Sequence, residues 1–228
     1  MKKESRIILA LDVEDRNKAL KICEVVEEYI DAIKIGYPLV LSSNLEIFAE
    51  IKEKFSKPLI ADFKVADIPE ISKSICKLAV EKGADYVIVH GFVGEDVIKA
   101  CSEVANIFVV ADMSHPGAEQ FMSRHSQKIA EISRKYAYGI VAPATRPGQI
   151  FKLRKIVKDL IIISPGVKAQ GAKVGDAIKA GADFEIIGRG IYQAPNPKEA
   201  AQEFSRIISN VKFRFDSAVM MNDGRSEG

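Results

Sequence analysis

Length, composition and charge set the first limits on this chain. It has 228 residues, 47% hydrophobic and 28% charged, so it can bury a large core and fits one α/β domain better than two. Its formal net charge is only +2, with no basic tract and no apolar run near ~20 residues, which argues against a nucleic-acid or membrane partner.

Short apolar runs recur along the chain and predict strands. They are rich in Ile and Val and do not alternate with polar residues, as expected of parallel strands that are buried on both faces. In chain order the runs are RIILALD (6–12), AIKIG (32–36), PLIADFK (58–64), DYVIVHG (85–91), NIFVVADMS (106–114), YGIVAPAT (138–145), LIIISPG (160–166) and FEIIGRG (184–190).

Amphipathic stretches at helical spacing separate these runs, for example over 19–30 and 45–55. Gly83 in EKGAD and Gly181 in KAGAD each stand where a helix needs a left-handed residue before the next strand. Eight units of ~25 residues predict a (β/α)8 TIM barrel with a single domain. A doubly wound open sheet is the alternative, although its usual Gly-rich first turn is missing from ALDVEDR.

The ends of the chain and its cysteines complete this prediction. We expect the barrel to occupy residues 1–211 and residues 212–228 to form a disordered or frayed C-terminal tail, because periodicity is lost there. The N-terminal apolar stretch is too short for a signal peptide. Cys23, Cys76 and Cys101 lack metal-ligand spacing and fall in helical patterns, which predicts buried reduced thiols and a cytoplasmic protein.

Polar residues close the apolar runs, and in a barrel those ends meet at one mouth. They are Asp12, Lys34, Asp62 with Lys64, His90, Asp112 with Ser114, Thr145 with Arg146, Ser164 and Arg189. A polar rim held together by salt bridges would explain the same pattern without a function.

Four charged residues of alternating sign stand out at this mouth. Lys34 ends the second run, Asp62 and Lys64 end the third, and Asp67 follows on the next loop. Adjacent strands lie ~4.8 Å apart, so the side chains should form one coupled group in which both lysines are protonated and both carboxylates ionised. A purely structural ion-pair network remains the alternative.

The loops after the last two runs have the features of a phosphate site. SPGVKAQGAKVG (164–175) is Gly-rich and shows no helical pattern until Asp176, which is typical of a loop that closes over a ligand. Barrels commonly bind phosphate with these two loops, and Arg189, Gln170 and Gly188 are the natural candidates. Alternatively, the glycines simply make the turns.

Taken together, the motifs resemble the orotidine 5′-monophosphate decarboxylases of the short archaeal type. The resemblance runs from the first to the eighth strand and rests on ALD, KIGYP, ADFKVADIPE, VHGF, MSHPG, TRP, SPGV with Gln170, and GRGIY. Any one motif is weak, but DFKxxDIP, MSHPG and a late GRxIY in this order are highly specific.

The resemblance implies decarboxylation of orotidine 5′-monophosphate to UMP, without metal or organic cofactor, by a homodimer with shared active sites. Lys64 would stabilise the carbanion at C6 and protonate it, which combines electrostatic stabilisation with general acid catalysis. Asp62 would lie near the departing carboxylate, Lys34 would belong to the same catalytic group, and Asp67 would reach the site of the partner subunit.

The same resemblance implies how the substrate is held. Ser114 would bind the pyrimidine edge, and Asp12 and Lys34 the ribose hydroxyls. The remaining implied contacts are Ile68, Pro165, Gln170, Gly188 and Arg189. Many archaeal relatives have Thr after DIPE for a ribose contact across the subunits, where this chain has Ile71, so we expect either its loss or a substitute contact from Ser72.

Two further groups of residues can also be explained by a purely structural role. By the same resemblance, Ile88, Val110 and Val141 would form an apolar floor for the leaving CO₂; the alternative is that they only fill the barrel. His90, His115 and His125 lack H-x-H or H-E-x-x-H spacing, so we expect no metal site, and we interpret His90 as a hydrogen-bonded structural residue.

Two rival functions remain open on the sequence. A Mg²⁺-dependent sugar-phosphate decarboxylase or aldolase of the same barrel group shares a D-x-K-x-x-D core. A non-catalytic nucleotide-binding barrel is the other, although the complete set of four charged residues argues against it.

Overall fold

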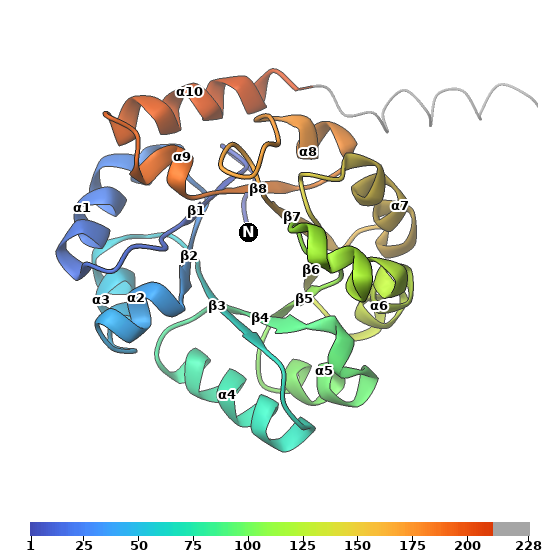
Figure 1. Ribbon diagram of the computed structural model, residues 1–228. Helices are drawn as coiled ribbons and strands as arrows, with labels where there is room; N and C mark the ends of the chain where they lie inside the picture. The colour runs from blue at the N-terminus through green and yellow to red at the C-terminus, as the bar shows by residue number, and fades with distance from the viewer. Residues whose placement is uncertain (212–228) are drawn as a thin grey trace, which may run out of the picture.

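The eight apolar runs form one closed parallel barrel. The computed structural model describes residues 1–211, and each strand pairs with its neighbours in sequence, β1 closing the ring against β8 (Figure 1). The strands are β1 (Ile7–Ala10), β2 (Ala32–Gly36), β3 (Leu59–Val65), β4 (Tyr86–His90), β5 (Ile107–Val110), β6 (Gly139–Val141), β7 (Ile161–Pro165) and β8 (Phe184–Ile187). The predicted (β/α)8 barrel is confirmed, and the open-sheet alternative is wrong because no edge strand is left.

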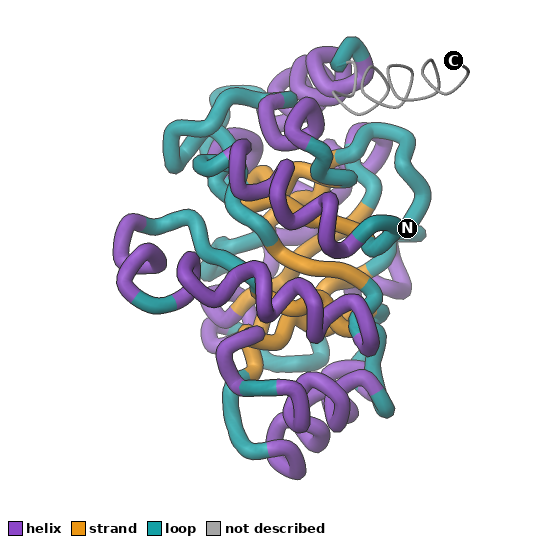
Figure 2. Tube along the Cα trace, turned by 90° about the vertical axis from the view of Figure 1, so that its right-hand side faces the viewer, coloured by secondary structure: helices purple, strands orange, loops and turns teal. Residues whose placement is uncertain are grey.

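Helices surround the barrel and cover the outer face of its strands, as Figure 2 shows from the side. The α-helices are α1 (Arg16–Val26), α2 (Tyr37–Ser42), α3 (Ile47–Lys54), α4 (Pro69–Glu81), α5 (Glu95–Ser102), α6 (Met122–Tyr136), α7 (Pro147–Val157), α8 (Asp176–Ala180), α9 (Arg189–Tyr192) and α10 (Pro197–Ser209), and the 3₁₀ helices are η1 (Glu27–Tyr29), η2 (Gly91–Val93) and η3 (Pro116–Gln120). The helical pattern over 45–55 becomes α3, and the pattern over 19–30 becomes most of α1 with η1. The short α2 has no counterpart in the sequence pattern, and Pro38 near its start favours it locally.

The turns and the cysteines agree with the sequence. Gly83 and Gly181 have φ values of +112° and +111°, so each adopts the left-handed conformation that ends a helix before a strand. The three cysteines are buried and unpaired. The expected tail, 212–228, lies outside the described residues. Within the described part of the chain, no helix is long and apolar enough to cross a membrane.

Strand β3 departs from regular geometry near its carboxyl end. Ala61 pairs with Val87, but the next paired residue is Val65, opposite Val89, so four residues of β3 advance while β4 advances by two. Within this bulge Lys64 has φ +43°, an uncommon value for a residue with a side chain. Because bulges re-aim side chains, this irregularity sets the direction of Lys64 independently of simple strand alternation.

Candidate active site

A cavity of about 330 Å³ opens at the carboxyl ends of the strands. Its size falls in the range of small-molecule sites. Nine of the residues predicted for the site line it, namely Asp12, Lys34, Asp62, Lys64, Ser114, Pro165, Gln170, Gly188 and Arg189. The barrel therefore does bring the polar strand ends together.

A chain of ion pairs forms one wall of the cavity. Asp62 links the two lysines, with Oδ2 2.6 Å from Nζ of Lys34 and Oδ1 2.7 Å from Nζ of Lys64. Nζ of Lys34 also lies 3.2 Å from Oδ1 of Asp12. The side chains of Lys34 and Asp62 are only 6% and 8% exposed, whereas that of Lys64 is 41% exposed. Lys64, together with Asp12 at 39%, is thus the part of the chain of ion pairs that a ligand in the cavity can reach most easily.

The charges of this wall stabilise one another. Burial alone would raise the pKa of Asp62, but the ammonium groups of Lys34 and Lys64 hold it at about 2. Burial alone would lower the pKa of Lys34, but Asp62 and Asp12 raise it above the ordinary value. Asp62 is therefore ionised and Lys34 protonated at neutral pH, as the sequence predicts.

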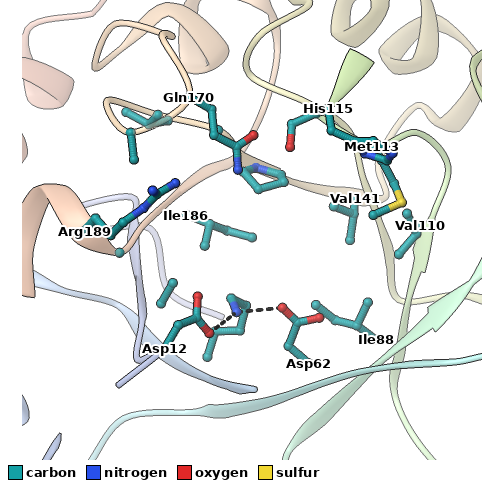
Figure 3. A pocket seen from close by; sticks show the side chains of 18 of the residues that line it. Asp12, Asp62, Ile88, Val110, Met113, His115, Val141, Gln170, Ile186 and Arg189 are labelled. Carbon is teal, nitrogen blue, oxygen red and sulfur yellow. Dashed lines mark hydrogen bonds and ion pairs between the residues drawn. The ribbon is translucent and has the colours of Figure 1, made fainter. Parts of the chain in front are cut away.

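The opposite side of the cavity carries the candidate phosphate contacts. Figure 3 shows Gln170 and Arg189 across the cavity from Asp12 and Asp62. Gln170 belongs to the loop after β7, and Arg189 begins α9 directly after β8. Both residues are exposed, so they stand at the open side of the site.

An apolar surface completes the lining. Ile88, Val110 and Val141, from β4, β5 and β6, all contact the cavity, as the sequence predicts. Met113 and Ile186 extend this surface. A reacting group placed against it would be shielded from water on that side.

Several lining residues had no role assigned from the sequence. Asp112, fully buried, binds Arg146 Nη2 at 3.1 Å and the Ser123 hydroxyl at 2.8 Å. Arg146 also donates to the carbonyl of Met113, so this ion pair fixes the chain just before Ser114. His115 and Tyr192 line the cavity as well. His115 lies inside MSHPG and Tyr192 inside GRGIY, so these two motifs could have identified them.

Three residues near β3 lie elsewhere. Asp67 and Ile68 are exposed and do not line the cavity of their own chain. Ser72 is fully buried, donating to the carbonyl of Asp67 at 2.8 Å and accepting from its N–H at 3.1 Å. The substitute ribose contact suggested for Ser72 is therefore wrong, because its hydroxyl is already used to shape the loop at Asp67.

The other polar strand ends behave as structural groups. Ser164 is fully buried and donates to the carbonyl of Ala142 at 2.6 Å. His90 was expected to be hydrogen-bonded, but its Nδ1 is buried without a partner among residues 1–211. Its ring instead packs on Phe92 at 4.8 Å, and burial together with the charge of Lys64 lowers its pKa. His125 lies within α6. Over residues 1–211, no three His, Cys, Asp or Glu side chains are grouped as a metal site requires.

Comparison with known proteins identifies the family. A family model described as orotidine 5′-phosphate decarboxylase / HUMPS matches residues 5–204. The chain belongs to this family. Its fold and the position of its cavity agree with that membership, because TIM barrels place their active sites at the carboxyl ends of the strands.

Individual members of the family are similar over nearly the whole chain. The orotidine 5′-phosphate decarboxylase of Methanosarcina mazei is 51% identical over 215 residues, which are 91% of this chain and 97% of that protein. The decarboxylase of Thermococcus kodakarensis is 46% identical, with 91% and 99% covered. A crystal structure of orotidine 5′-monophosphate decarboxylase from Methanocaldococcus jannaschii, complexed with the inhibitor BMP, matches with a TM-score of 0.85 and 46% identity, over 90% of this chain and 98% of that one.

Proposed function

We propose that this chain converts orotidine 5′-monophosphate to UMP and CO₂, a carboxy-lyase step of pyrimidine biosynthesis, with Lys64 as the residue that carries the chemistry. Relatives named for this reaction, at 46% to 51% identity over almost their full length, support the activity. They also favour it over the sugar-phosphate enzyme and the non-catalytic barrel. The observation that carries the proposed mechanism is the Asp62 carboxylate, which holds two lysines at the cavity wall.

The difficulty of the reaction explains why a fixed charge is needed. When the bond between C6 and the carboxylate breaks, its electron pair stays on C6 in the plane of the pyrimidine ring. The ring π system cannot delocalise a pair in that plane, so the surroundings must stabilise it. A preorganised ammonium group beside C6 lowers the energy of the developing carbanion without reorganisation during the reaction.

Lys64 fits both parts of this task. Its ammonium group is held 2.7 Å from Asp62 and its side chain is 41% exposed toward the open cavity. In the proposed step CO₂ leaves, a proton moves from Nζ of Lys64 to C6, and the neutral amine regains a proton from water. Lys34 supports this by pairing with Asp62 on the buried side, which keeps Asp62 ionised and oriented.

The remaining lining supplies binding and shielding. Asp12 and Lys34 would bind the ribose hydroxyls and Ser114 the pyrimidine edge, while Ile88 with its apolar neighbours would surround the leaving CO₂. Across the cavity, Arg189 and Gln170 would bind the phosphate, with Gly188 allowing close approach and Pro165 contributing to the wall. Binding energy from the phosphate could then be used at the distant reacting carbon.

We also propose a homodimer in which Asp67 and Ile68 complete the partner's site. Both residues are exposed and do not reach their own cavity. Large apolar side chains on the segments that follow β2, β3 and β4 are exposed as well, namely Tyr37, Leu41, Ile68, Ile71 and Phe92 at 46% to 80%. Exposed apolar groups on the segments that follow three neighbouring strands are typical of an interface, and a second copy would bury them.

Turnover assays separate the proposed decarboxylase from its two rivals, the Mg²⁺-dependent sugar-phosphate enzyme and the non-catalytic barrel. Purified protein should consume orotidine 5′-monophosphate, seen as loss of its absorbance, and should do so equally after treatment with EDTA. Loss of activity on chelation, or turnover of keto-sugar phosphates instead, would favour the Mg²⁺-dependent rival. Binding of UMP with no turnover would favour the non-catalytic barrel.

Mixing two inactive variants tests the shared site. Lys64→Ala and Asp67→Ala homodimers should each be inactive. Random exchange of subunits makes about half of the dimers heterodimers, and each heterodimer has one of its two sites with both Lys64 and Asp67 intact. The mixture should therefore show roughly a quarter of wild-type activity. No recovery, together with a monomer by light scattering, would contradict the dimer.

A cytoplasmic location remains a prediction, supported by three buried, unpaired thiols.

A further inference from the structure

A buried glutamate on β8 has no part in the mechanism above. Glu185 is fully buried, although its neighbour Ile186 lines the cavity. Because side chains alternate along a strand, Glu185 points away from the cavity, toward the layer of helices. Burial of a carboxyl group is costly unless its oxygens are hydrogen-bonded, so its contacts indicate what the residue does.

The hydrogen bonds to its carboxyl group come from the junction between the loop after β7 and the start of α8. The N–H of Gly175 donates to both carboxyl oxygens, at 2.9 Å and 3.0 Å, and the N–H of Ala177 donates to Oε1 at 3.1 Å. Gly175 has φ +91°, and a Cβ there would lie 2.8 Å from Val211 Cγ2. The loop end is thus fixed between β8 and the residues after α10, while α8 packs beside β8 (Figure 1).

The other part of this loop forms a wall of the cavity. Gly166, Val167, Ala169 and Gln170 all line it. The loop folds back on itself, because the N–H of Lys168 donates to the carbonyl of Ala172 at 2.7 Å. Only four residues, 171–174, separate the candidate phosphate contact Gln170 from Gly175, where Glu185 holds the chain.

We propose that Glu185 is a positioning residue that fixes the end of the 166–175 loop through its ionised carboxylate, and so sets how tightly the loop grips the substrate phosphate. The proposal rests on the proposed function for its substrate, but the tether itself does not. Ionisation matters because the carboxylate accepts from N–H groups with both oxygens, whereas a protonated carboxyl has one oxygen turned into a donor.

The surroundings place this change near neutral pH. Burial raises the pKa of Glu185 to about 7, the N–H groups of Gly175, Ala177 and Ile178 oppose this, and the charge of Asp176 on α8 adds to it. On the adjacent strands its register partners are Ile7 and Ser164, which carry no charge. The 166–175 loop should therefore bind the substrate phosphate more tightly as pH rises through about 7, and KM for the substrate should fall.

Glu185→Gln tests the proposal, because it keeps the shape and removes the charge. We expect KM for orotidine 5′-monophosphate at about pH 8 to rise about fivefold with kcat nearly unchanged. The fall of KM between about pH 6 and pH 8 should shrink to the part that comes from ionisation of the substrate phosphate at about pH 6. KM for phosphate-free orotidine should not change. Asp183→Asn is the matched control, since Asp183 is also buried but binds Arg154 and the N–H of Ile162. It should leave KM and its pH dependence as in the wild type.

Hydrogen exchange tests the tether without turnover. The amides of Gly175 and Ala177 should exchange about tenfold faster in Glu185→Gln, after correction for intrinsic rates, and in the wild type their protection should increase between about pH 6 and pH 8. The wild-type experiment needs no variant to fold. Unchanged protection in both experiments, or an unchanged KM profile in a folded Glu185→Gln enzyme, would overturn the proposal. A wild type that shows the tether but does not turn over the substrate would overturn the proposed function instead.

Discussion

The two sides of the barrel mouth are built differently. On the side of β2 and β3, the charged groups project from strands, Lys34 and Asp62 are less than a tenth exposed, and each is held by ion pairs of 2.6 to 3.2 Å. On the side of β7 and β8, Gln170 and Arg189 stand on a loop and at the start of a short helix, and both are exposed. Burial and ion pairs hold the groups of the first side in place, whereas Gln170 and Arg189 on the second side are exposed.

This difference suits the separate tasks that the proposed function gives to the two sides. Electrostatic stabilisation of a transition state requires charges that do not reorganise, and strand ends inside a closed barrel provide them. Capture and release of a phosphate require groups that can move, and loops provide those. Damage to the first side should therefore lower kcat, and damage to the second should raise KM.

Lys64→Ala should have the largest effect. Because it removes both the fixed charge and the proton donor, we expect kcat to fall by at least about 10⁴-fold. The protein should still fold, since Lys64 is half-exposed. Steady-state kinetics with circular dichroism measures both. Lys73→Ala, which removes a lysine from an exposed pair with Glu103, is the control and should retain full activity. Comparable rates for the two variants would remove Lys64 from the mechanism.

Asp62→Asn should affect both activity and stability. It leaves Lys34 buried with only Asp12 as a partner, so we expect kcat to fall about 10²-fold to 10³-fold and the free energy of unfolding at about pH 7 to fall by about 3 kcal/mol.

The free energy of unfolding at acid pH also tests the role of Asp62. The pKa of Asp62 is lowered from 3.8 to about 2 in the folded chain, so its contribution to stability is present above pH 3.8 and is lost as pH falls toward 2. The difference in unfolding free energy between wild type and Asp62→Asn should shrink over that range in denaturant titrations. A difference that stays constant down to about pH 2 would contradict the ion-pair account.

Arg189→Ala and Gln170→Ala test the side of the mouth at β7 and β8. We expect KM for orotidine 5′-monophosphate to rise about 10-fold to 100-fold, more for Arg189 because its proposed contact with the phosphate would be charge-assisted. Reaction of phosphate-free orotidine should be nearly unchanged. Equal losses on both substrates would show that these residues do not act through the phosphate.

Val141→Thr should have the smallest effect. It exchanges a methyl group for a hydroxyl of similar shape, placing a polar atom where the CO₂ is expected to leave, and kcat should fall about threefold to tenfold. Thermal unfolding is the second measurement. If stability falls while kcat does not, Val141 only fills the barrel.

Much of this architecture could be predicted from the sequence. Parallel strands buried on both faces must be apolar along their length, so the eight runs stood out, and their polar ends marked the mouth. The pairing of Lys34 with Asp62 could be expected from the adjacency of their strands, and that of Asp62 with Lys64 from their spacing of two residues on one strand.

What could not be predicted depends on local geometry and on packing between distant segments. The positive φ of Lys64 and the register shift in β3 have no sequence pattern of their own. Glu185 looks like one polar residue in an apolar strand until the loop end at Gly175 is placed against it. Among residues 1–211 the fold brings no hydrogen-bond partner to the buried Nδ1 of His90, and no sequence pattern predicts this.

Exchange of the C6 hydrogen of UMP tests the central claim most directly. If Lys64 protonates a C6 carbanion, the same step in reverse must remove that hydrogen and, in D₂O, replace it with deuterium from Nζ. Proton NMR of UMP with the wild type should show slow loss of the C6–H signal, and Lys64→Ala should show none. Exchange at equal rates in both proteins, or no exchange by a wild type that turns over orotidine 5′-monophosphate, would contradict the claim.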